Sequence, residues 1–283
     1  MPRMLVVVTE QEATPLGVPQ GRIAVQSRRT SLDKPPWRDL PLHEGVVESV
    51  FVRPAYLGES IAPFRVLAAD QAVIPYDGTR FLNRMDERID RYPGLARWWK
   101  GAEAIWNANR SSDKRTLADQ LDYIGQLRAQ FPIAPLRVVY TKAGTHLAAA
   151  VIEDAFGVID HSLYWAPAST VDEAHYLVAL LNTPTLGHLI RPFQAVGAFG
   201  PRHFDKYVWQ APIPMFDPTD PAHRDLSQLA IRSTQIARGV HIPSGEGFQA
   251  ARRRIRQALA SSRMDTLLTA ALKEVLVHDG ADH

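Results

Sequence analysis

The chain has 283 residues, of which 46% are hydrophobic and 22% are charged, and its formal net charge is +2. These values are typical of a folded globular protein and argue against disorder. The sequence contains no cysteine, which excludes a disulfide framework and thiolate zinc sites and fits a reducing compartment. No apolar run reaches membrane-spanning length, and the MLVVV segment near the start is too short for a signal peptide. We therefore expect a cytoplasmic protein.

The first part of the chain is predicted to contain short strands joined by turn-rich segments. Strands are expected at residues 3–9 and 21–27 and within residues 46–58 and 64–78. Between the second and third of these, Pro35 and Pro36 exclude a helix and indicate an extended polar loop.

Residues 80–130 are predicted to form a helical insert. Apolar residues recur at steps of three and four after Pro93, which predicts an amphipathic helix there. The same spacing predicts a second helix through Leu117, Leu121, Ile124 and Leu127. The tryptophans at helical spacing are expected to lie in the core rather than to form stacking platforms for a ligand; they are Trp98, Trp99 and Trp106.

Strands return after the insert and are followed by helices. Residues 136–144, 145–153 and 157–167 are predicted to form two successive hairpins, which turn at 142–144 and 154–157. Thr170 and Glu173 form a capping-box pattern for a helix that ends at Asn182, and a second helical stretch follows.

The C-terminal part of the chain is predicted to be helical. Asp220 is the expected cap of a helix with Pro221 in its first turn and its end at Gly239, and residues 246–276 indicate further helix. The whole pattern predicts an α+β fold. We expect a strand-rich domain at residues 1–217, with the insert at 80–130, and a helical tail at 218–283 packed on it.

The usual catalytic constellations are not found in the sequence. Phosphate-binding loops, dinucleotide fingerprints and nucleophile elbows do not occur, and the histidines lack metal-ligand spacing. Asp217 and Asp220 could hold a cation, but Asp-Pro turns and a helix cap explain them better. Glu153, Asp154 and Asp160 loosely resemble a nuclease carboxylate cluster without its lysine. No catalytic or metal-binding residue is therefore assigned, and whether the chain is an enzyme stays open.

Three basic features suggest contact with a polyanion. Arg28, Arg29 and Lys34 lie in the polar loop with Trp37, and Lys142 lies at a glycine-containing hairpin tip, where backbone amides can approach phosphate. The segment ARRRIRQALASSR, residues 251–263, carries five arginines and no acid. Each feature is also compatible with an ordinary solvated surface.

The stretch FQAVGAFGPRHFDKYVWQAPIP, residues 193–214, combines glycines, aromatic residues and cations most densely. Gly197 and Gly200 allow a backbone to approach a ligand closely. Arg202 can bind a guanine edge or a phosphate, and His203 and Lys206 add positive charge. Alternatively, the aromatic rings fill the core while the cations face water.

Several segments together resemble the C-terminal region of N-6 adenine DNA methylases of the type IIG-like restriction–modification class. They include RRTSLDKPPWRDLP, GVVESVFVRPAYLGESIAPFRVL, YPGLARWW and IDHSLYWAP. The most specific part is residues 181–224, with Leu-Asn, Gln-x-x-Gly-x-Phe-Gly-x-Arg, a Lys, Pro-Ile-Pro and Asp-Pro. The resemblance covers roughly residues 20–260.

This resemblance implies a DNA-binding target-recognition module for double-stranded DNA. The expected DNA contacts are Arg28, Arg29, Lys34, Arg53, Lys142, Gln194, Gly197, Gly200, Arg202, His203 and Lys206, with Gln194 and Arg202 at base edges. The sequence lacks the Gly-rich S-adenosylmethionine (SAM) motif and the Asn-Pro-Pro-Tyr motif of such methylases. SAM is therefore expected only in a separate methyltransferase domain or subunit.

Two other classes of function stay open. The chain could be a metal-dependent nuclease that uses Glu153, Asp154 and Asp160. It could instead be a helper subunit of a restriction–modification or phage-defence complex, with its helical tail docked on a partner.

Overall fold

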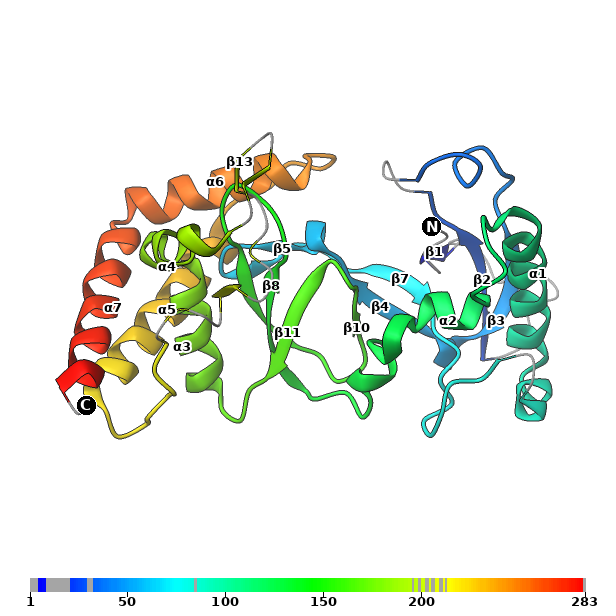
Figure 1. The fold of residues 1–283 in the computed structure, drawn as a ribbon, viewed down its shortest axis with the longest axis horizontal. Coiled ribbons are helices and arrows are strands. Elements are labelled where there is room, and N and C mark those ends of the chain that lie inside the picture. The colour runs from blue at the N-terminus through cyan, green and yellow to red at the C-terminus, as the bar shows by residue number, and fades with distance from the viewer. Residues whose placement is uncertain are drawn as a thin grey trace. The chain divides into compact units, whose positions relative to one another are not determined.

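The computed structural model describes residues 5–8, 21–29, 33–83, 86–194, 196–197, 200–201, 204, 207–208, 211 and 213–281. Its mixed helices and strands, with helices at the C-terminal end, confirm the predicted α+β class (Figure 1).

The chain forms two compact units, each built from several segments. The first unit comprises Met1–Ala55, Ala69–Ile133 and Phe156–Ile159, and the second comprises Tyr56–Ala68, Ala134–Ala155 and Asp160–His283. The predicted tail from residue 218 lies within the second unit, and the boundary at residue 217 stays a prediction.

A six-stranded sheet forms the base of the first unit, in the order β10-β4-β7-β1-β2-β3. The strands are β1 (Leu5–Val8), β2 (Arg22–Ser27), β3 (Glu44–Glu48), β4 (Val52–Tyr56), β7 (Asp70–Val73) and β10 (Val158–Ile159). Pairing is antiparallel between β1 and β2, β1 and β7, β2 and β3, and β4 and β7. Val25 and Val47 are buried in a core shared with helix α1 (Pro93–Asn109), which packs on β3.

Helix α1 begins where the sequence predicts, and a carboxylate from the sheet caps it. The side chain of Glu48 accepts hydrogen bonds from the amides of Gly94 (3.0 Å) and Leu95 (2.8 Å). These are donors that a helix N-terminus leaves unpaired. A Cβ atom at position 94 would lie 2.7 Å from the carbonyl oxygen of Val46, so this close approach requires glycine. The expected burial of Trp98, Trp99 and Trp106 is confirmed.

The second helix of the insert is shorter than predicted. Helix α2 spans only Leu117–Leu121, and the prediction that it continues through Leu127 is wrong. The side chain of Asp122 accepts hydrogen bonds from the amides of Leu127 and Arg128, which draws the chain into 3₁₀ turns. Ile124 consequently adopts a φ of 49° and is 74% exposed.

The second unit contains a three-stranded antiparallel sheet in the order β11-β8-β9. Strand β8 is Leu136–Thr141, β9 is Ala149–Glu153 and β11 is Leu163–Pro167. The first predicted hairpin, between β8 and β9, is confirmed. The second is wrong, because β11 pairs with β8 and β10 joins the other sheet. Strand β8 is almost entirely buried, and a central position gives its backbone groups partners on both edges. A two-stranded pair, β5 (Ile61–Ala62) and β6 (Arg65–Val66), packs beside β9.

Five helices complete the second unit. They are α3 (Val171–Asn182), α4 (Pro184–Ile190), α5 (Pro221–Gly239), α6 (Phe248–Ser261) and α7 (Met264–Ala281). The predicted cap residues are confirmed, since Thr170 accepts from Glu173 N and Asp220 from Ala222 N. The capping box is formed only in part, because the Glu173 carboxylate accepts from Ser169 N and not from Thr170 N. Helix α3 packs against α5 and against strands β8 and β9.

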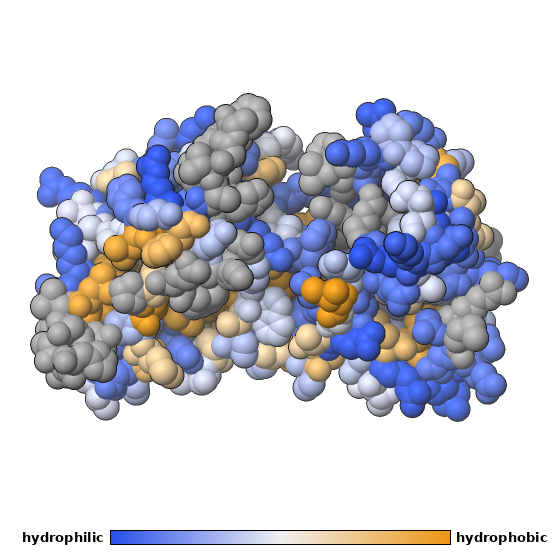
Figure 2. Space-filling model, in the orientation of Figure 1, coloured by the Kyte–Doolittle hydropathy of each residue, from blue (hydrophilic) through white to orange (hydrophobic). Residues whose placement is uncertain are grey.

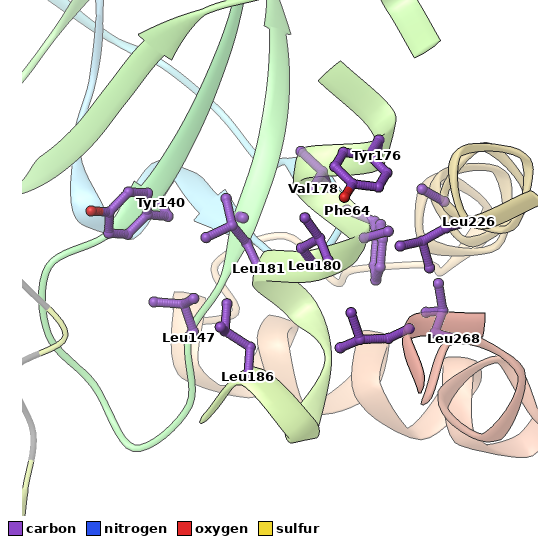
Figure 3. Close-up of a cluster of buried hydrophobic side chains, with 14 of the residues drawn as sticks. Phe64, Tyr140, Leu147, Tyr176, Val178, Leu180, Leu181, Leu186, Leu226 and Leu268 are labelled. Atoms are coloured by element: carbon purple, nitrogen blue, oxygen red, sulfur yellow. The ribbon is translucent and has the colours of Figure 1, made fainter. Parts of the chain in front are cut away.

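The core of the second unit joins the hairpin to these helices. Figure 3 shows Leu147, from the β8–β9 connection, beside Leu186 of α4, and both side chains are buried. Hydrophobic side chains also gather on the surface over α4 and α7 (Figure 2). Leu189 of α4 is 38% exposed, and Leu267 of α7 is 46% exposed. Among the described residues, no helix is long and apolar enough to cross a membrane.

Candidate nucleic-acid interface

The tip of the β8–β9 hairpin presents Lys142. Its ammonium group lies 4.4 Å from the centroid of the Tyr164 ring, which itself stacks on Tyr140 at 5.3 Å. This cation–aromatic contact holds the ammonium group over the Tyr164 ring, and the residue is half-buried. Gly144 follows with a φ of 152°, a conformation that side chains rarely adopt. The tip is therefore a compact turn with a positioned cation.

Within its described residues, the predicted recognition loop contacts this hairpin at Phe204. The amide of Phe204 donates a 2.8 Å hydrogen bond to the carbonyl oxygen of Lys142, and a Cβ atom at Gly144 would contact the Phe204 ring at 4.0 Å. Phe204 and Val208 are 5% and 0% exposed, so they anchor this part of the loop in the core. The alternative that its aromatic residues fill the core therefore holds for Phe204.

The start of the same loop contains three more predicted residues. Gln194 is only 7% exposed. Gly197, in β12 (Val196–Gly197), pairs directly with Gly200, in β13 (Gly200–Pro201), as part of a short antiparallel pair. The other three residues predicted in this loop, Arg202, His203 and Lys206, lie outside the described residues.

The arginines of α6 divide into structural and surface groups. Arg252 is buried and donates to the carbonyl oxygens of Ile61 (2.8 Å) and Gly58, and burial lowers its pKa to about 10. Arg253 and Arg254 are exposed, and Arg254 is paired with Glu246 at 2.8 Å.

Arg256 of α6 extends the basic surface of the hairpin. Partial burial, and then the positive charge of Arg256, lowers the pKa of His146, which shows that α6 lies near the hairpin tip. Arg256 was not among the predicted DNA contacts. The signal for it was the acid-free arginine segment, but periodicity alone could not tell which arginines face the hairpin. Lys142 and Arg256 are called the hairpin cations below.

In the first unit, the predicted contacts of the polar loop lie in different environments. Arg29 and Lys34 are exposed. Arg28 forms an ion pair with Asp70, and Trp37 stacks on Trp106 with ring centroids 5.3 Å apart. Of the three predicted contacts in this loop, Arg29 and Lys34 are therefore the exposed ones, while Arg28 and Trp37 also contribute to packing.

Arg53 is in a different environment from the other predicted contacts. It is 7% exposed, donates a 3.0 Å hydrogen bond to the carbonyl oxygen of Phe156, and lies 4.1 Å from the centroid of that ring. Its guanidinium also lies 5.3 Å from the Phe131 centroid. These contacts give Arg53 a structural role within the first unit, whatever contact it makes with DNA.

The three acidic residues considered for a nuclease have partners within the protein. Asp154 accepts a 2.8 Å hydrogen bond from the Tyr56 hydroxyl, and burial together with this carboxylate raises the pKa of Tyr56. Glu153 is exposed and lies 4.0 Å from Arg238. The part of the chain that the structure describes contains no group of three His, Asp or Glu residues arranged to hold a metal ion.

Asp160, the third of these, binds the turn that follows β10. Burial raises the pKa of its carboxyl group, but the hydrogen bonds and charge of His161 and the hydrogen bonds of Ser162 outweigh burial and lower it to about 2. The two aspartates at the suspected cation site, Asp217 and Asp220, likewise serve a turn and a helix cap, as the simpler interpretation predicted.

The comparisons with known proteins find similar structures but do not assign the chain to a family. No protein-family model and no curated protein matches the sequence. One similar structure is that of the type IIL restriction–modification enzyme MmeI in complex with DNA, at 14% identity and a TM-score of 0.47, covering 79% of this chain. Another is that of the type IIG restriction endonuclease BpuSI, at 11% identity and a TM-score of 0.40, covering 88%. This chain spans 31% and 30% of their respective lengths. With TM-scores below 0.5, neither likeness establishes a shared activity.

Proposed function

We propose that this chain is a DNA-binding target-recognition module that works with a SAM-dependent adenine methyltransferase domain located elsewhere. The resemblance of residues 181–224 to the recognition region of N-6 adenine DNA methylases supplies the class of function. The observation that carries the proposal is the hydrogen bond between Phe204 and Lys142, because Phe204 belongs to that segment and Lys142 is a positioned cation.

The charges around this junction suit the backbone of a nucleic acid. The hairpin cations come from two elements of one unit, and positive charges gathered on one surface attract an external anion. Phosphate contacts of this kind fix the position of a duplex, whereas base contacts select its sequence. Arg29 and Lys34 supply further exposed cations in the first unit.

The loop at residues 193–214 would select the DNA sequence. Gln194 is buried, so its proposed contact with a base edge requires its side chain to leave that position. Arg202 is then the main candidate, because a guanidinium can bind the O6 and N7 atoms of guanine together. Gly197 and Gly200 would let the backbone approach the duplex.

The test is binding of random-sequence duplex DNA, followed by fluorescence anisotropy from about 50 to 200 mM salt. Several phosphate contacts should lower the affinity by orders of magnitude over this range, because binding releases condensed counterions. Binding that is steep in salt would support the proposal and justify selecting for a preferred sequence. An absence of binding at about 50 mM salt would contradict DNA binding by this chain alone.

The cofactor assignment has its own test. We propose that SAM is bound by the methyltransferase partner and that this chain contributes only DNA recognition. Isothermal titration of the chain with SAM should give no binding under conditions in which it binds DNA. A saturable SAM isotherm would contradict this division of roles.

A helper role is the second candidate. The exposed apolar side chains of Leu189 on α4 and Leu267 on α7 support a surface for a partner subunit. The variant Leu189→Asp/Leu267→Asp should then abolish co-purification with a co-expressed methyltransferase subunit while the chain keeps its affinity for DNA. Co-purification at the wild-type level would contradict a docking role for this surface.

A further inference from the structure

A second potential binding site lies within the first unit. It is a cavity of about 470 Å³ between the segment Pro75–Asn83 and the chain from α2 to Phe131. Cavities that hold small organic ligands measure roughly 300–1,000 Å³. The cavity is therefore large enough for a ligand such as a nucleotide.

Aromatic rings form one side of this cavity. Tyr76 stacks on Phe131 with centroids 3.9 Å apart and planes 26° apart, and Phe81 packs edge-on against Phe131 at 5.5 Å. All three residues are only half-buried, so each keeps part of its surface accessible. Ring faces and edges of this kind attract planar heteroaromatic groups.

Two arginines supply polar groups at the same cavity. The side chain of Arg80 is 63% exposed and its nearest carboxylate, Asp86, is 3.9 Å away. The side chain of Arg128 is 71% exposed and binds Asp122 through Nε. Each guanidinium has five N–H donors, so both retain donors for a ligand.

The acidic residues of the cavity are already engaged by the protein. Asp122 accepts hydrogen bonds from the amides of Leu127 and Arg128 as well as from the Arg128 side chain. Asp119 accepts from both the amide and the hydroxyl of Thr116, and these hydrogen bonds lower its pKa. The carboxylates therefore hold the walls together, and the arginines remain the groups that can bind a ligand.

We propose that this cavity binds a nucleotide, with the base against Tyr76, Phe81 and Phe131 and the phosphate at Arg80. A purely apolar ligand would gain nothing from two exposed guanidinium groups. An inorganic anion would gain nothing from three aromatic rings. A planar base joined to a phosphate uses both features at once, and it can come from a free mononucleotide or from an unpaired nucleotide of a DNA strand.

The proposal goes beyond duplex recognition and does not depend on it. The first experiment is isothermal titration of the full chain with AMP, with ribose 5-phosphate as the ligand that lacks a base. We expect saturable binding of AMP and at least about tenfold weaker binding of ribose 5-phosphate, because stacking of the base contributes to the affinity. Equal affinity for the two ligands would overturn the role of the rings.

Variants locate the site. Tyr76→Leu and Arg80→Gln should each weaken AMP binding about tenfold. Arg97→Gln is the matched control, because Arg97 is exposed on α1 and does not line the cavity. Melting curves show whether Tyr76→Leu is folded, and Arg80→Gln provides the test at an exposed position if it is not. Wild-type AMP affinity in folded Arg80→Gln would overturn the proposed phosphate position.

A duplex with one unpaired 2-aminopurine distinguishes the two sources of the nucleotide. Stacking in the cavity should quench its fluorescence, and Tyr76→Leu should restore the fluorescence without changing affinity for a fully paired duplex. Quenching without AMP binding assigns the site to a DNA strand, and AMP binding without quenching assigns it to a free nucleotide. If neither ligand responds, the proposal is wrong, even where the chain binds paired DNA.

Discussion

The backbone of Phe204 is hydrogen-bonded to the backbone of Lys142 at 2.8 Å, across 62 residues of sequence. Because main-chain atoms make this bond, the Lys142 side chain can be changed without removing it. The buried Phe204 ring then keeps the loop in place. The charge at the hairpin tip and the anchoring of the loop can therefore be tested separately.

Lys142→Ala should lower affinity for all duplexes alike and reduce the salt slope by about one unit, because one phosphate contact is lost. Anisotropy titrations at several salt concentrations measure both effects. Lys273→Ala is the matched control, since Lys273 is exposed on α7 of the same unit. An unchanged slope for Lys142→Ala would remove Lys142 from the interface.

Phe204→Ala should lower the free energy of unfolding by about 3–5 kcal/mol, because it leaves a cavity in a packed core. Sequence-specific DNA binding should weaken more than non-specific binding, since the loop loses its anchor. Denaturant unfolding and anisotropy measure the two effects. Phe193→Ala provides the comparison, because Phe193 is 48% exposed and its loss should change stability little.

Arg28 and Arg29 are adjacent in sequence but should respond differently. Arg29→Ala should weaken DNA binding without changing the melting temperature, since its side chain is exposed. Arg28→Ala should lower the melting temperature, because it leaves Asp70 without its ion-pair partner. Equal effects of both variants on affinity and none on melting would contradict this distinction.

Arg53→Ala should destabilise the first unit by about 2–4 kcal/mol, because a buried hydrogen bond and two cation–aromatic contacts are lost. Urea unfolding followed by tryptophan fluorescence measures this loss. Full stability together with lost DNA affinity would instead make Arg53 a contact residue alone.

Asp160→Asn should reduce stability at neutral pH by about 2 kcal/mol, because the folded carboxyl group has a pKa of about 2 against 3.8 in the unfolded chain. The folded pKa is the lower one, so this stabilisation is present above about pH 4 and disappears as the pH falls toward about 2. The difference in unfolding free energy between the wild type and Asp160→Asn should shrink over that range. Plasmid nicking in Mg²⁺ or Mn²⁺ that Asp160→Asn abolishes would instead revive the nuclease hypothesis.

The features that could be predicted best from the sequence are those that depend on residues close together in the chain. Asp220 and Pro221 define the start of α5 within two positions, and Thr170 defines the start of α3 in the same way. The end of α2 was missed because it depends on the direction of one side chain, that of Asp122, which periodicity does not report.

Pairings between strands and loops that lie far apart in the sequence could not be predicted from it. The spacing of apolar residues could not show that β11 pairs with β8 instead of β9, since both arrangements bury the same residues. For the same reason, the hairpin tip and the loop were each predicted to contact DNA, but their junction at Phe204 was not. The proposed nucleotide cavity was also not predicted, because it combines residues from two segments about 40 positions apart.

The division of the chain into discontinuous segments limits how this protein can be dissected. The chain passes from one unit to the other between residues 55 and 56, and again at 68–69, 133–134, 155–156 and 159–160. No single cut, by a protease or at a gene boundary, releases either unit intact. Gene rearrangement that transferred one unit without the other would have to join several separate gene fragments. The two units are therefore expected to be transferred between proteins together, as one continuous gene segment.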